Sequence, residues 1–570
     1  MPTAAVESTL LLTMPVPLAN VIDMVSSSRG AAVGAAEVDA VVVGAGFAGL
    51  RALHTLRSQG MSVAVLEAAD DVGGVWQWNR YPGARCDVES YDYSYSFSDE
   101  LQQQWRWSER YATQPEILRY IHHVAERFDL LRDVHLEQRM TASAWDDEDG
   151  RWTVSTERGD TWTARFLVMA TGQLSTTKTP DLPGLADFTG EVLLTAQWPR
   201  EGRDLTGKRV GVIGTGSSGM QLVPIVAQQA EHLSVFQRTA NFSVPATNGP
   251  ISDERDAEVK ATYAQRREAA RNSPSGLGMI PPKTSALEVT EAERTARYEE
   301  FWATAGFGFA LVYHDILRSQ EANDTAADFI RGKIAAKIED PATREKLLPQ
   351  DFPFAAKRPS VDSGYFEAFN RDNVELVDIR ENPIQGVTAT GIRTSAGEHE
   401  LDVLVFATGF DALTGSLLRP DITGRDGRTL RSTWSAGPVT HLGLAVHGFP
   451  NMFIICGPGS PSLLSNVLLS TEQHVDWIAA LLAHAEAHGV ERIEATAEAG
   501  RAWVAHVNER AQETLYPRAT SYYNGDEMPG KPRVFMPYPG GVRAYRRILE
   551  RTVAEGYSGF DLRAAVSAVA

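Results

Sequence analysis

The sequence predicts an α/β protein with two Rossmann-type domains, each built around a parallel sheet. Two stretches have the pattern strand, tight turn, helix, strand: "VDAVVVGAGFAGLRALHTLRSQGMSVAVLEAA" (38–69) and "GKRVGVIGTGSSGMQLVPIVAQQAEHLSVFQRT" (207–239). Two further apolar strands end in Ala-Thr-Gly, at residues 170–172 and 407–409. Apolar strands of this kind are typical of parallel sheets that are buried on both faces.

The order of these patterns predicts how the chain divides. We expect an N-terminal extension at 1–38, a first domain at 39–165 and 405–560, a second domain at 173–245 and 355–400, and an insertion at 246–354. The insertion is rich in Ala, Glu, Lys and Arg at helical spacing, so we expect it to be mainly helical. The apolar stretch 8–25 is interrupted by two prolines and Asp23, and no basic residue precedes Arg29. A secretory signal needs such a basic residue, so we expect a mobile extension instead.

Charge and cysteine content restrict the class of partner. The net charge of −19 opposes binding to nucleic acid or to an anionic membrane, because both require a basic face. No stretch approaches the roughly 20 apolar residues of a membrane span. With only Cys86 and Cys456 there is no disulfide framework and no cysteine metal site. We therefore expect a cytoplasmic protein without a metal, and no required protein partner is evident.

The first glycine loop predicts a dinucleotide site. Gly44, Gly46 and Gly49 follow an apolar strand and open a helix, which permits a tight turn and close approach of a pyrophosphate. Glu67 ends the next strand, where an acid accepts hydrogen bonds from a ribose diol. The alternative is a structural turn followed by a surface glutamate.

The second glycine loop has a basic residue where the first has an acid. The residues that we expect to bind the second nucleotide are Gly214, Gly216, Ser217, Ser218, Gly219, Arg238 and Thr239. An arginine at this position suits the 2′-phosphate of NADP, through charge pairing and bidentate hydrogen bonds. Arg238 could instead be a solvated charge. A chain with both loops is most simply a flavoprotein, with FAD in the first site and NADPH as reductant in the second.

The absence of redox and metal motifs limits the reactions that the reduced flavin can undergo. Dithiol exchange would need a CxxC pair, and the sequence has neither that pair nor an HExxH or cysteine–histidine metal cluster. The adjacent His122 and His123 are on an expected helix, where solvent or packing roles are commoner than metal binding. Two fates remain, namely hydride transfer to an organic acceptor or reaction with oxygen.

Several motifs resemble those of type I, or class B, flavin-dependent Baeyer–Villiger monooxygenases. "GGVWQWNRYPGARCD" (73–87) contains the complete family motif Gly-Gly-x-Trp-x4-Tyr/Phe-Pro-Gly-x3-Asp. "FTGEVLLTAQWP" (188–199) resembles the family fingerprint Phe-x-Gly-x3-His-x3-Trp-Pro/Asp. Other family-like stretches, such as "AAKRPSVDSGYFEAFNRDNVEL" and "PGKPRVFMPYPGGVRAYR", continue in the expected order, so that the resemblance spans about residues 40–546.

The resemblance implies a reaction. NADPH reduces FAD, O2 adds to the flavin as co-substrate, and the flavin peroxide attacks a ketone to give an ester or lactone. Two alternatives stay open: a related flavin monooxygenase that oxidises nitrogen or sulfur, and an uncoupled redox protein that binds FAD and NADP. Small and apolar residues in "GPGSPSLLSN" suit a hydrophobic ketone, but neither the particular ketone nor the selectivity or the oligomeric state follows from the sequence.

The resemblance also assigns site residues. Arg358 corresponds to the active-site arginine of the family, which supplies a permanent positive charge beside the flavin. Asp87 corresponds to the acid that contacts this arginine and the cofactors, and Lys357 to the lysine of the NADP 2′-phosphate. An ion pair that only joins the domains is the alternative for Asp87 and Arg358. Further positions expected to bind cofactor are Phe47, Val75, Trp76, Trp78, Tyr93, Met140, Val467 and Tyr522.

Two positions depart from the family pattern. The fingerprint histidine is Leu194 here, in a stretch that we interpret as a linker between the domains. This change puts domain motion and coupling in doubt more than the reaction itself. Tyr522 replaces a tryptophan that reaches the NADP ribose. Tyrosine keeps an aromatic face and a donor, but the hydrogen bond must shift.

Overall fold

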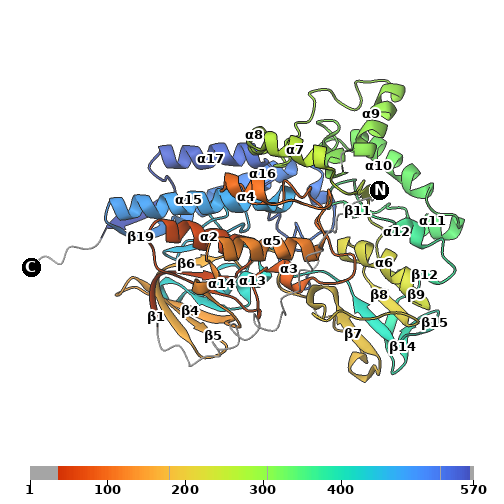
Figure 1. The fold of residues 1–570 in the computed structure, drawn as a ribbon, viewed down its shortest axis with the longest axis horizontal. Coiled ribbons are helices and arrows are strands. Elements are labelled where there is room, and N and C mark those ends of the chain that lie inside the picture. Colours follow the sequence, from red (N-terminus) through yellow and green to blue (C-terminus); the bar gives the residue numbers. More distant parts are fainter. Residues whose placement is uncertain (1–35, 179, 305, 527, 565–570) are drawn as a thin grey trace, which may run out of the picture.

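Two β-sheets lie toward opposite ends of the long axis of the molecule, with helices packed over them (Figure 1). The structure is a computed structural model and describes residues 36–178, 180–304, 306–526 and 528–564. The predicted extension at 1–38 therefore lies almost entirely outside the described residues. Two sheets, each with helices packed over it, agree with the α/β fold class that the repeated strand–turn–helix pattern predicts.

The first sheet is parallel around its centre and carries an antiparallel excursion. Its order is β17 (Asp421–Thr423), β4 (Met140–Asp146), β5 (Arg151–Thr156), β6 (Thr161–Met169), β1 (Ala36–Val43), β2 (Val63–Leu66) and β3 (Val134–His135), and β18 (Met452–Ile454) also pairs with β6. Residues 40–43 of β1 are all buried, as is usual for a parallel strand covered on both faces. Strands β4 and β5 form the antiparallel excursion.

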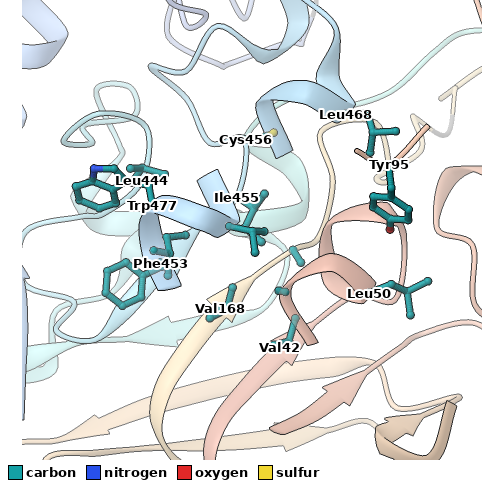
Figure 2. Packing of buried hydrophobic residues seen from close by; sticks show 14 of the residues in the cluster. Val42, Leu50, Tyr95, Val168, Leu444, Phe453, Ile455, Cys456, Leu468 and Trp477 are labelled. Carbon is teal, nitrogen blue, oxygen red and sulfur yellow. The ribbon is translucent and has the colours of Figure 1, made fainter. Parts of the chain in front are cut away.

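Helices from both ends of the chain accompany the first sheet. They are α2 (Phe47–Ser58), α3 (Val75–Trp78), α4 (Asp99–Gln104), α5 (Gln114–Arg127), α13 (Gly415–Leu418), α14 (Leu430–Thr433), α15 (Val467–Ala487), α16 (Ala497–Gln512) and α17 (Val542–Ala554). The two-stranded sheet of β19 (Val490–Ala495) and β20 (Phe560–Ala564) lies beside α15. Figure 2 shows part of the core, which includes Val42 of β1, Leu50 of α2 and Leu468 of α15. Residues of the C-terminal third thus pack in the same core as β1 and α2.

The second sheet is parallel throughout. Its order is β12 (Val374–Asp378), β9 (His232–Gln237), β8 (Arg209–Ile213), β16 (Val403–Phe406) and β7 (Glu191–Leu194). Helices α6 (Ser217–Gln229) and α12 (Tyr365–Ala368), a three-stranded sheet of β13 (Ile384–Val387), β14 (Gly391–Thr394) and β15 (Gly397–Glu400), and the pair β10 (Ser243–Pro245) and β11 (Ser360–Asp362) accompany it. Because β16 pairs with β8 along its whole length, residues 405 and 406 belong with this sheet, not with the first one.

The stretch that we interpreted as a linker begins as a strand. β7 pairs in parallel with β16, with Leu194 opposite Phe406. At Gly190 a Cβ atom would lie 2.5 Å from the carbonyl oxygen of Asp402, so the approach of the two segments requires glycine there. Trp198 is buried. Residues 191–194 are therefore the edge strand of the second sheet. The side chain of Leu194 packs against an apolar cluster of residues from that sheet.

The insertion between β10 and β11 is helical. Its helices are α7 (Asp253–Ala261), α8 (Tyr263–Arg271), α9 (Glu291–Thr304), the 3₁₀ helix η6 (Gly306–Leu311), α10 (Gln320–Ala335) and α11 (Pro341–Leu347). The side chains of Ser252, Ser319 and Asp340 accept hydrogen bonds from the first turns of α7, α10 and α11. Such caps satisfy backbone N–H groups that have no partner within the helix, which explains where these helices begin.

Two linkers join the sheets and run side by side. Thr177 and Phe410 form an antiparallel bridge. The backbone N–H of Asp411 donates to the carbonyl of Thr176, and the N–H of Leu413 to the carbonyl of Gln173. The two Ala-Thr-Gly endings therefore lead into one paired crossing between the domains. Across the described ranges, no helix combines the length and the apolar character that crossing a membrane requires.

Candidate active site between the two nucleotide loops

The first glycine loop lies against the end of a neighbouring strand. Gly44 has φ +105°, and a Cβ atom there would lie 2.6 Å from the carbonyl oxygen of Ala170. At Gly49 a Cβ atom would lie 1.7 Å from the carbonyl oxygen of Gly44. Both positions therefore exclude a side chain, and they bring the start of α2 close to the strand ends.

Glu67 is a buried carboxylate that braces this loop. One of its oxygens accepts a hydrogen bond from the N–H of Ala45 (2.6 Å) and the other from the N–H of Ala69 (2.8 Å). Burial raises the pKa of Glu67, and the backbone hydrogen bonds oppose that rise. An acid at the end of β2 suits a ribose diol and repels a 2′-phosphate.

A cavity of about 440 Å³ runs from the first glycine loop to Arg358. Its lining includes most of the positions expected for the first nucleotide and for catalysis: Gly44, Gly46, Phe47, Glu67, Val75, Trp76, Trp78, Asp87, Tyr93, Met140, Arg358 and Val467. Tyr522, which was expected to contact NADP, lines the same cavity. Gly49 packs behind the loop and does not line the cavity. Segments that are far apart in the sequence thus meet around one space of the size of a cofactor site.

The cavity also has walls that the sequence analysis did not identify. They include Gln138, Arg139, Thr171, Gln173, Ser416 and Arg419. Gln173 is buried, and its side-chain amide donates to the carbonyl of Cys456 and to the hydroxyl of Ser462. Its position directly after the first Ala-Thr-Gly was the one available signal. Cys86 also faces the cavity, and burial raises the pKa of its thiol well above the usual range.

Arg358 and Asp87 form a bidentate ion pair at the far end of the cavity. Nε and Nη2 of Arg358 each donate to one carboxylate oxygen of Asp87, both at 2.9 Å. Nη1 donates to the carbonyl of Leu463 at 3.2 Å. Burial alone would lower the pKa of Arg358, but the Asp87 carboxylate outweighs it and raises the pKa. The arginine therefore stays charged in a site that is largely removed from water.

Tyr522 reaches the same cavity from the C-terminal third. Its ring lies 4.7 Å from that of Tyr523, which is buried. Further along this segment, the ammonium group of Lys531 donates to Asp411 (2.6 Å) and to the carbonyl of Ala412 (3.1 Å). An ion pair with the second linker thus holds the segment that carries Tyr522.

The second glycine loop repeats the geometry of the first. Gly214 has φ +109°, and a Cβ atom there would lie 2.4 Å from the carbonyl oxygen of Ala407. At Gly219 a Cβ atom would lie 2.2 Å from the carbonyl oxygen of Gly214, whereas at Gly216 it would meet no atom within 4 Å. This loop therefore has open space in front of the start of α6.

The basic residues expected for the second nucleotide lie in a different environment. Arg238 directly follows β9 and is exposed, and the carbonyl of Thr239 accepts a hydrogen bond from the Thr215 hydroxyl. Lys357 Nζ lies 4.7 Å from the centroid of the Phe352 ring. Ser217 Oγ lies 3.5 Å from Ser360 Oγ. Among the described residues, the second-loop positions named above do not line the cavity that holds Arg358.

Side chains also join the two domains close to the ion pair. The Tyr81 hydroxyl donates to the side-chain oxygen of Gln221 at 2.7 Å, and the Gln221 amide donates to the carbonyl of Arg85 at 3.2 Å. At Gly83 a Cβ atom would lie 2.3 Å from the carbonyl oxygen of Gln221. The motif at 73–87 therefore packs directly on α6 of the second domain, beside the glycine loop that opens this helix.

Comparisons with known proteins give strong similarities over most of the chain. Residues 41–321 match the family described as pyridine nucleotide-disulphide oxidoreductase. A Baeyer–Villiger monooxygenase of Pseudooceanicola batsensis is 45% identical over 528 residues, which cover 92% of this chain and 96% of that protein. A phenazine N-monooxygenase of Lysobacter antibioticus is 42% identical over 528 residues, with coverage of 92% and 97%.

Solved structures agree with these relatives. The chain is similar to an oxidized steroid monooxygenase bound to NADP, with 55% identity, a TM-score of 0.89 and coverage of 92% of this chain and 99% of the other. It is also similar to a closed form of cyclohexanone monooxygenase, with 44% identity, a TM-score of 0.91 and coverage of 93% and 100%. These coverages leave less than a tenth of the chain outside the similarity.

Proposed function

The chain belongs to the flavin-dependent Baeyer–Villiger monooxygenases, and from that premise we propose which of its residues bind each cofactor and which take part in the reaction. FAD and NADPH are its cofactors and O2 is its co-substrate. The reaction inserts one oxygen atom next to a ketone carbonyl and gives an ester or lactone. The roles of individual residues and the kind of ketone are our proposals.

The cavity of the first loop fits FAD. Gly44 and Gly46 leave room for a pyrophosphate at the start of α2, and Glu67 accepts hydrogen bonds from the ribose. At Gly74 a Cβ atom would lie 2.9 Å from Gly46 Cα, so the close approach of these two segments at the first glycine loop requires glycine. The other positions that would contact this cofactor are Phe47, Val75, Trp76, Trp78, Asp87, Tyr93, Met140 and Val467.

The second loop fits NADPH. Arg238 is an exposed cation directly after β9, at the position where a 2′-phosphate would distinguish NADPH from NADH. Thr239 and Lys357 would assist it, and the hydroxyls of Ser217 and Ser218 would bind phosphate oxygens at the start of α6. Tyr522 would contact the same nucleotide from the C-terminal third.

The bidentate pair of Arg358 and Asp87 is the observation that carries the catalytic assignment. Reduced FAD supplies the chemistry that activates oxygen. Arg358 holds a permanent positive charge in the cavity and stabilises negative charge that develops there. Asp87 orients the guanidinium and keeps it protonated. The two side chains are 24% and 26% exposed, so the pair is partly removed from water. Such a pair costs desolvation energy, which is consistent with a functional role rather than a stabilising one.

We place the substrate among hydrophobic ketones. The wall beside Arg358 includes Leu463 and Val467, whose side chains are apolar. The steroid monooxygenase at 55% identity supports a large substrate, and cyclohexanone monooxygenase at 44% identity supports a small cyclic one. Oxidation of nitrogen is the second candidate, because a phenazine N-monooxygenase is 42% identical. That chemistry has less need of a cation beside the flavin.

The surroundings of the enzyme are part of the proposal. Cys86 and Cys456 are both buried free thiols in the structure, which suits a reducing compartment such as the cytoplasm. The net charge of −19 disfavours nucleic acid and anionic membranes as partners. The enzyme would therefore act on its ketone without a further protein.

The test combines turnover with product analysis. Purified FAD-loaded protein is given NADPH, O2 and a panel of a steroid ketone, cyclohexanone, a linear ketone, an aryl ketone, a thioether and a tertiary amine. We expect ester or lactone in the same amount as NADPH consumed, and loss of at least 100-fold in product formation in Arg358→Ala with FAD retained. Arg380→Ala is the matched control, because it removes a half-exposed arginine that pairs with Asp351 and Asp378 outside the cavity wall. Sulfoxide or N-oxide as the sole product would contradict the proposal.

A further inference from the structure

The face of the Arg358 guanidinium is covered by an aromatic ring from the helical insertion. Arg358 Cζ lies 4.3 Å from the centroid of the Phe307 ring, within the range of cation–π attraction. We propose that Phe307 is a positioning residue that holds Arg358 in its working orientation. This inference rests on the role proposed above for Arg358.

The geometry leaves donors of Arg358 free to act. A guanidinium has five N–H groups in one plane. Two of them donate to Asp87 and one to the carbonyl of Leu463, so two remain that have no partner among the described residues. The contact joins the guanidinium carbon and the ring of Phe307, and none of the hydrogen bonds of Arg358 involves that ring. Phe307 thus restrains the arginine without competing for the hydrogen bonds that the reaction needs.

Phe307 is itself held from both sides. Two residues further on, Phe309 is fully buried, stacks on Phe329 at 5.8 Å and contacts the edge of Phe354 at 5.8 Å. On the other side, the carbonyl of Thr304 accepts a hydrogen bond of 2.7 Å from Arg110. A ring anchored at both flanks loses little further freedom when it contacts the guanidinium, which favours a positioning role.

The 3₁₀ helix η6, which carries Phe307, begins very close to the first domain. Gly306 has φ +49°, and a Cβ atom there would lie 2.7 Å from the hydroxyl oxygen of Tyr111. Arg358 is therefore contacted by three separate parts of the chain: Asp87 of the first domain, Leu463 of the C-terminal third and Phe307 of the insertion. The insertion, which carries no predicted site residue, thus supplies one of the contacts of Arg358.

Loss of the ring should affect orientation but not charge. In Phe307→Leu the ion pair of Arg358 with Asp87 remains, so Arg358 stays protonated. The guanidinium loses the contact with the aromatic ring that restrains its orientation. We expect kcat with a ketone to fall about tenfold and the share of NADPH that ends as hydrogen peroxide to rise. The KM for NADPH should change less than about twofold, because the residues proposed to bind it are untouched. Phe307→Tyr keeps the ring face and should restore most of the coupling.

The matched control is another arginine–phenylalanine contact of the same insertion. Arg297 Cζ lies 5.1 Å from the ring of the half-buried Phe301. Phe301→Leu removes an equal ring from α9 without touching Arg358. For all variants we would measure kcat, both KM values, product and peroxide per NADPH, FAD content and Tm, so that loss of folding is separated from loss of orientation.

Three results would overturn the inference. They are wild-type coupling in Phe307→Leu, equal uncoupling in Phe301→Leu, and failure of Phe307→Tyr to improve on the leucine variant. Arg358→Ala is run in parallel to separate the two proposals. If it keeps coupled turnover, the role of Arg358 fails and this inference fails with it. If it loses product while Phe307→Leu does not, only the role of Phe307 is wrong.

Discussion

The two glycine loops have nearly the same local geometry but different surroundings. In both loops the first glycine has a positive φ and lies against an alanine carbonyl at the end of a neighbouring strand, and the third lies against the carbonyl of the first. The middle glycines differ. A Cβ atom at Gly46 would lie 3.3 Å from Gly74 Cα, whereas one at Gly216 would meet nothing within 4 Å.

The difference arises from segments that are distant in the sequence. Residues from β4, the start of α15 and the segment around Tyr522 enclose the cavity in front of the first loop. The basic residue of the second loop, Arg238, remains exposed. An enclosed site suits a cofactor that stays bound, and an open site suits one that enters and leaves in each cycle. Under the proposed assignment, the same local motif would therefore bind a resident nucleotide in one domain and an exchanging nucleotide in the other, according to what covers it.

The largest expected effect comes from the third glycine of each loop. Gly49→Ala places a Cβ atom 1.7 Å from the Gly44 carbonyl, so we expect loss of at least about 90% of bound FAD. Gly219→Ala makes the equivalent clash at 2.2 Å with Gly214. It should keep FAD and weaken NADPH binding. Flavin absorbance per protein and NADPH titration measure the two outcomes.

Gly332→Ala is the matched control for both loop variants, since its Cβ atom would meet nothing within 4 Å and its backbone is helical. If Gly219→Ala loses FAD as readily as Gly49→Ala, then the two loops are not independent sites and the comparison fails.

A smaller effect should follow from the exposed cation of the second loop. Arg238→Ala removes a charge-assisted contact worth about 1.5–3 kcal/mol, so we expect the KM for NADPH to rise roughly 10- to 100-fold. The KM for NADH, which lacks the 2′-phosphate, should stay the same. Steady-state kinetics with both nucleotides tests this, and an equal rise for NADH would refute the assignment. FAD content should be unaffected.

The smallest expected effect concerns the segment around Tyr522, which lines the cavity of the first loop. Lys531→Met removes the ion pair with Asp411. The side chains of Lys531 and Asp411 are 15% and 25% exposed, respectively. A partly exposed pair is worth about 1 kcal/mol, so a roughly fivefold increase in proteolysis of the segment around Tyr522 is expected. Asp411→Asn should have a similar effect, and the two changes together should not add.

Lys346→Met is the control for the Lys531 variants, because its pair with Glu381 lies outside the cavity wall. Additive effects of Lys531→Met and Asp411→Asn would show that the pair does not hold the segment.

Local sequence was enough to predict the apolar strands beside the glycine loops, the loops themselves and the helical nature of the insertion. These features depend on residues that are close in the chain, such as Gly44 and Gly49 with one apolar strand before them. The edge strand at 191–194 was missed, since its pairing with β16 joins segments about 200 residues apart. A short apolar run of this kind predicts neither a strand nor a linker by itself.

The sequence by itself determined the two nucleotide loops and the opposite charges of Glu67 and Arg238 that follow them. Through its motifs it also determined the family. Only the tertiary structure decided which loop is enclosed, that Asp87 meets Arg358 through two hydrogen bonds of 2.9 Å, and that Phe307 covers the guanidinium. The physical reason is that backbone turns and charge are properties of neighbouring residues, whereas cavities and side-chain contacts arise when distant segments pack together.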